Sequence, residues 1–199
     1  YVKQQILINL NAKHTRVAVI ENGELRDIYI ELANKPETVG NIYKGKIVRV
    51  LPGMHAAFIE IGMERTAFLQ QRDFTSKLYE GQDILVQVIK DPVDGKGARV
   101  TTQVSISSRA LVFVPNLKQS SISSKITDIT ERERLHNLVS ANNFIVRTAA
   151  VGARSLDIDK NYLLQQWQNI QAAFSTAKTG AMIYKDCNLL LRVFRDIIT

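Results

Sequence analysis

Residues 55–62 read His-Ala-Ala-Phe-Ile-Glu-Ile-Gly, and this stretch decides the fold. Apolar residues at positions 57, 59 and 61 alternate there with Phe58 and Glu60, which is the period of a β-strand with two different faces. The apolar face predicts the interior of a small barrel. Phe58 then lies on the outer face, where a large aromatic side chain is unusual.

Four further strand-like segments surround this one and complete a barrel. Pro-Gly, Gly and Asp-Gly punctuation separates the five segments, which are 42–51, 55–61, 66–69, 83–90 and 98–105. Five short strands in about 65 residues favour a five-stranded OB-fold barrel, the commonest small barrel of that size.

The flanking segments have a different character. Three short strands, 5–10, 15–20 and 25–30, come first, with an Asn22-Gly23 hairpin signal between the last two. After residue 106 we expect a buried strand at 111–114, a helix opened by a Thr130–Glu133 capping box and a strand at 143–149. Two more helices follow. Their inward residues are Leu163, Trp167, Ile170 and Phe174 in the first, and Leu190, Val193, Phe194 and Ile197 in the second, which begins near Asn188.

The resulting fold class is α+β, with a barrel inserted in an α/β domain. The predicted boundaries are 1–36 for the first part of the host domain, 37–105 for the barrel and 106–199 for the second part.

Composition sets broad limits on function. The 199 residues are 45% hydrophobic and 23% charged, as in ordinary globular proteins. No apolar run approaches the roughly 20 residues of a membrane helix, and the start does not resemble a signal peptide. The single cysteine, Cys187, allows no internal disulfide, so a cytoplasmic location is expected.

The net charge does not by itself indicate that the barrel segment binds nucleic acid. The net charge is +7, but residues 37–105 hold 9 basic and 8 acidic side chains, and the excess lies in residues 106–199, with 12 basic and 7 acidic. A basic balance favours a polyanionic partner. The barrel would have to hold nucleic acid by more than bulk charge.

Exposed aromatics on such a barrel suggest base stacking. Phe58 and Phe68 are the candidates, each worth about 1–3 kcal/mol per stacked base; the alternative is that both rings belong to the core. Lys44, Lys90 and Lys96 are candidate phosphate contacts, and the alternative for each is a simply solvated lysine.

Arg147 and Thr148 end the strand at 144–146 and offer a fork of donors and a hydroxyl. Together with backbone N–H groups they could hold a terminal phosphate. A strand-end ion pair is the alternative, and chemistry alone favours it.

Catalytic signatures are missing. His14, His55 and His136 have no metal-ligand spacing, and no phosphate-binding loop, dinucleotide fingerprint or nucleophile elbow occurs. The acidic residues form no obvious metal cluster, and Asp186 and Asp196 are interpreted as surface charges. We therefore expect no catalytic residue, metal or cofactor in this chain, and no RNA cleavage by it alone.

Nearly the whole chain resembles the ribonuclease E/G family. The matching segments, in order, are 40–47, 51–62, 66–69, 81–88, 96–102, 108–115, 131–135, 145–150 and 192–196. Leu51–Met54 and Lys90–Pro92 look more like the G type of this family than the E type.

The resemblance implies roles for individual residues. In the family an S1 barrel lies inside a ribonuclease-H-like domain without catalytic role, and it contacts RNA through residues that match Phe58, Phe68 and Lys96. Arg147 and Thr148 match a pocket that senses a 5′-monophosphate, and Val112 matches an apolar residue lining it. Ser108 stands where the family has a pocket glycine. A pocket arginine falls at Ser124 or Lys125.

The resemblance also implies a parent enzyme of RNA processing and decay, which cleaves single-stranded RNA and prefers 5′-monophosphorylated ends. Such an enzyme cuts in a following DNase-I-like domain with Mg²⁺ and can share zinc between subunits of a homo-oligomer. That domain is not in the sequence. The chain is shorter than the family after Phe74, around Lys118 and around Ala141. One alternative is a stand-alone S1-type RNA-binding module without cleavage, and another is a protein-interaction scaffold.

Overall fold

The computed structural model describes residues 3–35, 37–70, 74, 77–93, 95–139 and 143–197. These residues contain a closed five-stranded barrel, two further sheets and three α-helices, so the α+β fold class is confirmed. Two compact units account for the chain: residues 1–38 with 187–199, and residues 39–186.

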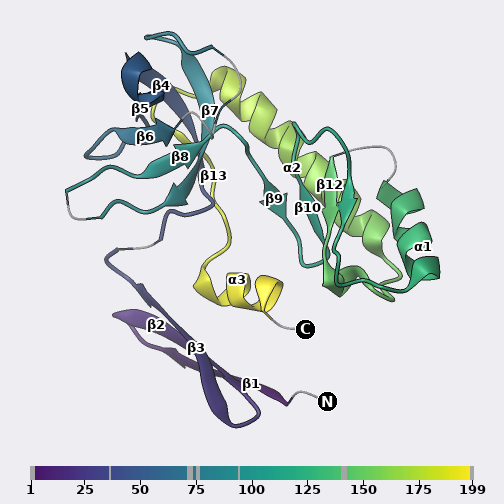
Figure 1. The fold of residues 1–199 in the computed structure, drawn as a ribbon. Coiled ribbons are helices and arrows are strands. Elements are labelled where there is room, and N and C mark those ends of the chain that lie inside the picture. Colours follow the sequence, from purple (N-terminus) through teal and green to yellow (C-terminus); the bar gives the residue numbers. More distant parts are fainter. Residues whose placement is uncertain are drawn as a thin grey trace. The chain divides into compact units, whose positions relative to one another are not determined.

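The barrel consists of β4 (Ile42–Leu51), β5 (Ala56–Glu60), β6 (Ala67–Gln70), β7 (Asp83–Lys90) and β8 (Arg99–Thr101). Its strand order is β4-β5-β6-β8-β7, and pairing of β7 with β4 closes the ring (Figure 1). The predicted OB-fold barrel is confirmed. Strand β8 is shorter than the predicted segment 98–105, because the Thr101 hydroxyl accepts the Gln103 N–H at 3.0 Å and the chain turns away.

Alternation fills the barrel as the sequence predicts. Ala57, Ile59 and Ile61 are fully buried, whereas Phe58 and Glu60 between them are half-buried on the outer face. Ile47, Leu69, Val86, Val88 and Val100 complete the interior with other apolar residues.

Gly45 in strand β4 is buried against the barrel interior. A Cβ at this position would lie 2.5 Å from Cγ2 of Ile59 and 3.3 Å from methyl groups of Ile61 and Val86. The interior therefore has no room for a side chain here. Beyond the ring, β4 also pairs with the short strand β13 (Met182–Tyr184).

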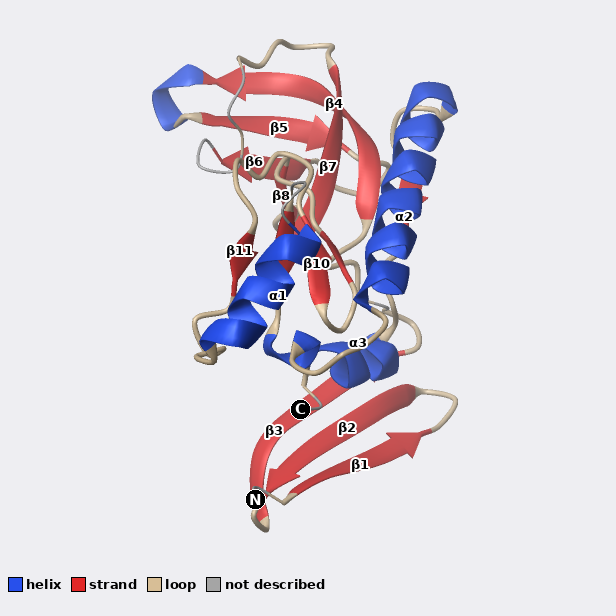
Figure 2. Cartoon of the chain, turned by 90° about the vertical axis from the view of Figure 1, so that its right-hand side faces the viewer, coloured by secondary structure: helices blue, strands red, loops and turns tan. Residues whose placement is uncertain are grey.

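The rest of this unit is a four-stranded sheet with two helices. Its strand order is β11 (Ser121–Ile122), β12 (Phe144–Val146), β10 (Leu111–Phe113) and β9 (Ile106–Ser107). Helices α1 (Ile129–Val139) and α2 (Leu156–Thr176) share a core with it, whose buried side chains include Leu111, Phe113, Phe144, Leu135, Leu163 and Ile170. Figures 1 and 2 show α2 reaching from this sheet to the barrel.

The cap of helix α1 lies two residues before the start of the predicted capping box. The Glu131 N–H donates to Asp128 Oδ1 at 2.7 Å, so Asp128 caps the helix and Thr130 lies inside it. The prediction of Thr130 as the cap was wrong because an aspartate two residues earlier competes for the same backbone donors.

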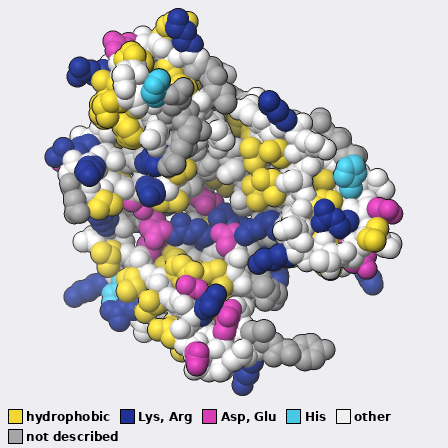
Figure 3. Space-filling model, in the orientation of Figure 1, with side chains coloured by type: hydrophobic (Ala, Val, Ile, Leu, Met, Phe, Trp, Pro, Cys, Tyr) yellow, Lys and Arg dark blue, Asp and Glu magenta, His cyan; other side chains and the backbone are white. Residues whose placement is uncertain are grey.

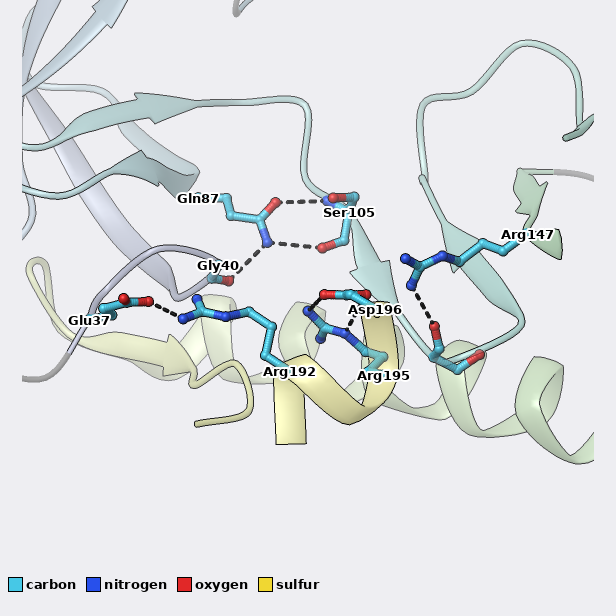
Figure 4. A network of polar contacts seen from close by, with 9 residues as sticks. Glu37, Gly40, Gln87, Ser105, Arg147, Arg192, Arg195 and Asp196 are labelled. Atoms are coloured by element: carbon cyan, nitrogen blue, oxygen red, sulfur yellow. Dashed lines mark hydrogen bonds and ion pairs between the residues drawn. The ribbon is translucent and has the colours of Figure 1, made fainter. Parts of the chain in front are cut away.

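A buried glutamine joins the two ends of the barrel segment. The Gln87 side-chain amide donates to the carbonyls of Gly40 and Ser105, both at 2.9 Å, and its oxygen accepts the Ser105 N–H at 2.9 Å (Figure 4). Gly40 precedes the first barrel strand and Ser105 follows the last. The chain thus enters and leaves the barrel at one place.

The other unit is a three-stranded antiparallel sheet with helix α3 (Leu189–Asp196). Its strands are β1 (Gln4–Leu10), β2 (His14–Glu21) and β3 (Glu24–Leu32). Positive φ angles at Asn22 and Gly23 confirm the predicted hairpin turn. An ion pair joins Glu37 to Arg192 within this unit (Figure 4).

Helix α3 begins as predicted, with Asn188 accepting the Leu191 N–H at 3.0 Å. Leu189 and Val193 are buried against Val17, whereas Phe194 is 41% exposed. The inward placement of Phe194 was wrong, because the buried stripe of this short helix runs through positions 189 and 193. The ribonuclease-H-like domain and the boundaries at 36 and 106 stay predictions.

Within the described ranges, no helix has both the length and the apolar character needed to cross a membrane.

Gly45→Ala should destabilise the protein. The added methyl group overpacks a closed barrel interior, which costs on the order of 1–3 kcal/mol. Denaturant unfolding of the full chain measures this loss of stability. Gly53→Ala is the matched control, because a Cβ at Gly53 meets nothing within 4 Å. Equal unfolding midpoints for the two variants would contradict the packing argument.

The Glu131 carboxylate joins α1 to the turn at 148–152, and we expect the stabilisation from this contact to depend on pH. This carboxylate accepts from Arg134 Nε and Nη2 at 2.8 and 2.7 Å and from the Gly152 N–H at 2.9 Å. The hydrogen bond from Arg134 is the largest cause, with that from Gly152 second, and together they lower the pKa of Glu131 from 4.5 to about 2. A lowered folded-state pKa contributes stability that is complete above the unfolded value and is lost as pH falls through the folded value.

The stability advantage of wild type over Glu131→Gln should therefore be constant above about pH 6 and shrink between pH 4.5 and about 2. Urea unfolding at a series of pH values measures it. Glu133→Gln, on the same helix, is the control and should show no such profile. A pH-independent difference for Glu131→Gln would contradict the assignment.

Candidate nucleic-acid interface

Two phenylalanines form a cross-strand pair on the outside of the barrel. Phe58 in β5 and Phe68 in β6 are direct register partners, and their ring centroids lie 5.8 Å apart with the planes inclined by 58°. Both side chains are half-buried, with the barrel interior on the other side of each strand. The predicted outward register is thus confirmed.

These rings line a cavity of about 570 Å³, and the predicted Lys96 lines it as well. The other lining residues are Arg65, Thr66, Gly95, Gly97 and Arg99. Strands β5 and β6 and the turn before β8 therefore bring together three residues that lie up to 38 positions apart in the sequence (58, 68 and 96). Asp94, part of the predicted turn, lies outside the described residues.

Backbone contacts hold the Lys96 turn against β6. The Lys96 N–H donates to the Val93 carbonyl at 2.9 Å, and the Phe68 N–H donates to the Ala98 carbonyl at 2.7 Å. A Cβ at Gly97 would lie 1.9 Å from the Thr66 carbonyl oxygen, so only glycine allows this approach. Lys96 is held beside the rings by these contacts.

The cavity is positively charged. Arg65, Lys96 and Arg99 line it, and none of the described lining residues is acidic. Arg65 and Lys96 are exposed and form no ion pair with the part of the chain that the structure describes. Arg99 donates to Gln70 Oε1 at 2.7 Å. Figure 3 shows basic side chains beside apolar ones along the left margin of the barrel.

Sequence reasoning missed Arg65, Thr66 and Arg99. The outward direction of Arg99 could have been predicted from alternation, because it lies between the fully buried residues Ala98 and Val100. Arg65 and Thr66 lie in and beside the loop between β5 and β6, where no periodicity applies.

The predicted Lys44 contacts other protein groups. Its ammonium group donates to the Phe174 carbonyl at 3.0 Å, lies 5.0 Å from the Phe174 ring centroid and 3.6 Å from Asp83 Oδ2, and the side chain is only 12% exposed. It fastens the end of α2 to the barrel and does not line the cavity. Lys90, at the end of β7, is exposed and is the register partner of Arg99, but it does not line the cavity either.

The second predicted site lies at one end of the four-stranded sheet. The Arg147 N–H donates to the Ala110 carbonyl at 2.8 Å, and its guanidinium donates to the Ser108 carbonyl at 3.4 Å (Figure 4). Thr148 is exposed and begins the 3₁₀ turn Thr148–Ala150. Val112, half-buried, pairs with Ile145 in β12, two residues before Arg147.

Lys125 approaches the same end of the sheet from β11. The Ser123 N–H donates to the Val146 carbonyl at 2.9 Å, and the Lys125 N–H donates to Ser123 Oγ at 3.4 Å. Lys125 itself is exposed. The loop after β11 therefore lies beside the end of β12, where Arg147 begins.

Ser108 differs from the other members of this group. Its hydroxyl donates to Asp159 Oδ2 at 2.8 Å and accepts the Leu111 N–H at 3.1 Å. The hydroxyl is thus engaged by protein groups, and a carboxylate lies next to it. Any anion at this end of the sheet is better served by Arg147, Thr148 and Lys125.

Among the described residues, no three His, Cys, Asp or Glu side chains gather as candidate metal ligands.

A sequence model of the Ribonuclease E/G family matches residues 105–199. Ribonuclease G of Escherichia coli K12 is 39% identical over 219 residues, covering 96% of this chain and 45% of that protein. Ribonuclease G of Haemophilus influenzae is 38% identical, with 98% and 45% coverage, and ribonuclease E of Escherichia coli K12 is 30% identical, with 99% and 21% coverage.

The chain spans less than half the length of these relatives. The matched length of 219 exceeds the 199 residues of the chain, so the relatives carry residues without a counterpart here. The three shorter places stay predictions, and those after Phe74 and around Ala141 lie outside the described residues. With its identity to ribonucleases G and E along nearly the whole sequence, the chain belongs to the ribonuclease E/G family.

Proposed function

We propose that this chain is the RNA-binding and 5′-end-sensing part of a single-strand-specific endoribonuclease. The observation that carries the proposal is the outward Phe58–Phe68 pair in a cavity whose described charged lining residues are all basic. Unpaired bases stack on the rings, and Lys96 binds the adjoining phosphate.

The geometry of the rings favours single strands. Paired bases in a duplex lie parallel, about 3.4 Å apart. The two rings are inclined by 58° with centroids 5.8 Å apart, so two bases stacked on them cannot stay parallel to each other. A strand that binds here has to be free to unstack.

The second part of the proposal concerns the 5′ end. A terminal monophosphate carries a charge of about −1.5 to −2 and three acceptor oxygens. Arg147, Thr148 and Lys125 would bind these oxygens, with Val112 as an apolar border and the Ser108 backbone positioning the guanidinium. A 5′-hydroxyl lacks the charge, and a triphosphate adds bulk.

Cleavage is assigned to the rest of the parent enzyme. The relatives are named ribonucleases and are more than twice as long as the matched part. The described residues do not gather a ligand set for the Mg²⁺ or zinc that the family resemblance implies, and no reaction step is assigned to them. The homo-oligomeric state and cytoplasmic location of the parent also stay proposals.

Phe58→Ala should weaken binding of single-stranded RNA by about 1–3 kcal/mol with an unchanged salt dependence, because a stacked base is lost and no charge is. Lys96→Ala should lower the slope of log affinity against log salt by about one. Fluorescence titration of a labelled ten-nucleotide RNA at several salt concentrations measures both. Tyr79→Ala removes another exposed aromatic, 58% exposed and outside the cavity, and should bind like wild type. If Phe58→Ala also matches wild type, the stacking role is wrong.

A 5′-monophosphorylated RNA should bind more tightly than the same RNA with a 5′-hydroxyl or triphosphate. Arg147→Ala and Thr148→Val should each remove this difference while leaving the hydroxyl form unaffected. Arg154→Ala removes a nearby exposed arginine and should preserve the difference. Competition titrations at one fixed salt concentration decide it. Equal affinities for all three ends in wild type would reduce Arg147 to a strand-end structural residue.

A further inference from the structure

Strand β4 carries a bulge beside the aromatic pair. Its register with β5 shifts between Ile47 and Arg49, so that Ile47 opposes Ile59 and Arg49 opposes Phe58. Ile47 is fully buried and Val50 packs on the barrel core, whereas Val48 and Arg49 between them are both exposed. Strict alternation would direct one of these two residues inward, and the bulge leaves both outside.

The bulge extends the aromatic pair into a row across the strands. Register partners connect Arg49 to Phe58, Phe58 to Phe68, and Phe68 to Arg99. Neighbouring strands lie about 4.8 Å apart, so the three steps from Arg49 to Arg99 span on the order of 14 Å. An arginine therefore stands at each end of the two rings.

Arg49 lacks a protein partner among the described residues. No ion pair or hydrogen bond joins its guanidinium to them, and the nearby Glu80 carboxylate accepts the Val50 N–H at 3.0 Å instead. Lys46, three residues earlier on β4, lies 3.9 Å from Asp83 Oδ1. An exposed arginine beside an outward aromatic has the fork of donors that matches a phosphate.

We propose that Arg49 forms a second phosphate site on the β4 side of the aromatic pair, opposite Lys96 and Arg65. An RNA strand crosses β5 and β6 at a steep angle, with its bases on Phe58 and Phe68 and a phosphate held at each side. This assignment rests on the proposed RNA-binding function of the barrel. It predicts that full binding requires an RNA long enough to reach from one basic side to the other.

The test compares Arg49→Ala, Arg49→Lys and Phe58→Ala in the full chain with labelled oligouridylates of three and ten nucleotides. For the ten-mer, Arg49→Ala should weaken binding by roughly three- to ten-fold and lower the salt slope by about one. For the three-mer, which cannot span both basic sides and the rings, the loss should be much smaller. Arg49→Lys should restore the salt slope, because it keeps the charge. Lys178→Ala, an exposed charge after α2, is the control and should change neither length.

The outcomes separate this inference from the function it rests on. If wild type binds the ten-mer and Phe58→Ala weakens it while Arg49→Ala does not, the second phosphate site is wrong and the stacking site stands. Equal losses from Arg49→Ala and Lys178→Ala would also overturn the site, because they would show bulk charge alone. If wild type binds neither RNA, both the function and the inference fail. Matching unfolding midpoints of the Arg49 variants and wild type ensure that binding is compared between folded proteins.

Discussion

The missing side chain at Gly45 is the constraint on which the barrel depends. β4 pairs with β7 along its first half and with β5 along its second half, and it also pairs with β13. Gly45 lies next to the position where β4 changes from pairing with β7 to pairing with β5, and its backbone there lies against Ile59, Ile61 and Val86. Two positions further on, the register shift between Ile47 and Arg49 leaves Arg49 exposed. Interior packing and the presentation of the candidate RNA-binding row are thus consequences of one strand's path.

The barrel is joined to the second sheet of its unit by polar groups as well as apolar ones. The buried amide of Gln87 forms hydrogen bonds with Gly40 and Ser105, where the chain enters and leaves the barrel, and Lys44 donates to the Phe174 carbonyl near the end of α2. A lysine with 12% exposure requires such partners, because an unpaired buried ammonium group is strongly disfavoured. Lys44 therefore stabilises the attachment of α2, whereas the phosphate contacts that we propose come from cations that face outward.

Sequence periodicity predicted the features that depend only on neighbouring residues. Alternation gave the outward position of Phe58, and the helical stripe gave Leu163 and Ile170, because both follow from periods of two and 3.6 residues. The role of Lys44 could not be predicted, since its partner Phe174 is 130 residues away in the sequence. The outward position of Arg49 could not be predicted, because it results from a bulge, and a bulge depends on how two strands pair and not on the sequence of one strand. Asp128 outcompeted Thr130 as the helix cap, and the sequence offers both within three positions.

A barrel with a nearly neutral total charge can still offer cations to a polyanion if some of its basic side chains lack an ion-pair partner. Residues 37–105 hold 9 basic and 8 acidic side chains. Lys44 and Lys46 lie within 4 Å of Asp83, while Arg49, Arg65, Lys90 and Lys96 have no ion-pair partner among the described residues. Under the proposed function, so few unpaired cations imply that RNA affinity depends only weakly on salt and comes mostly from stacking on the two rings. Because stacking requires unpaired bases, the same proposal accounts for a preference for single strands.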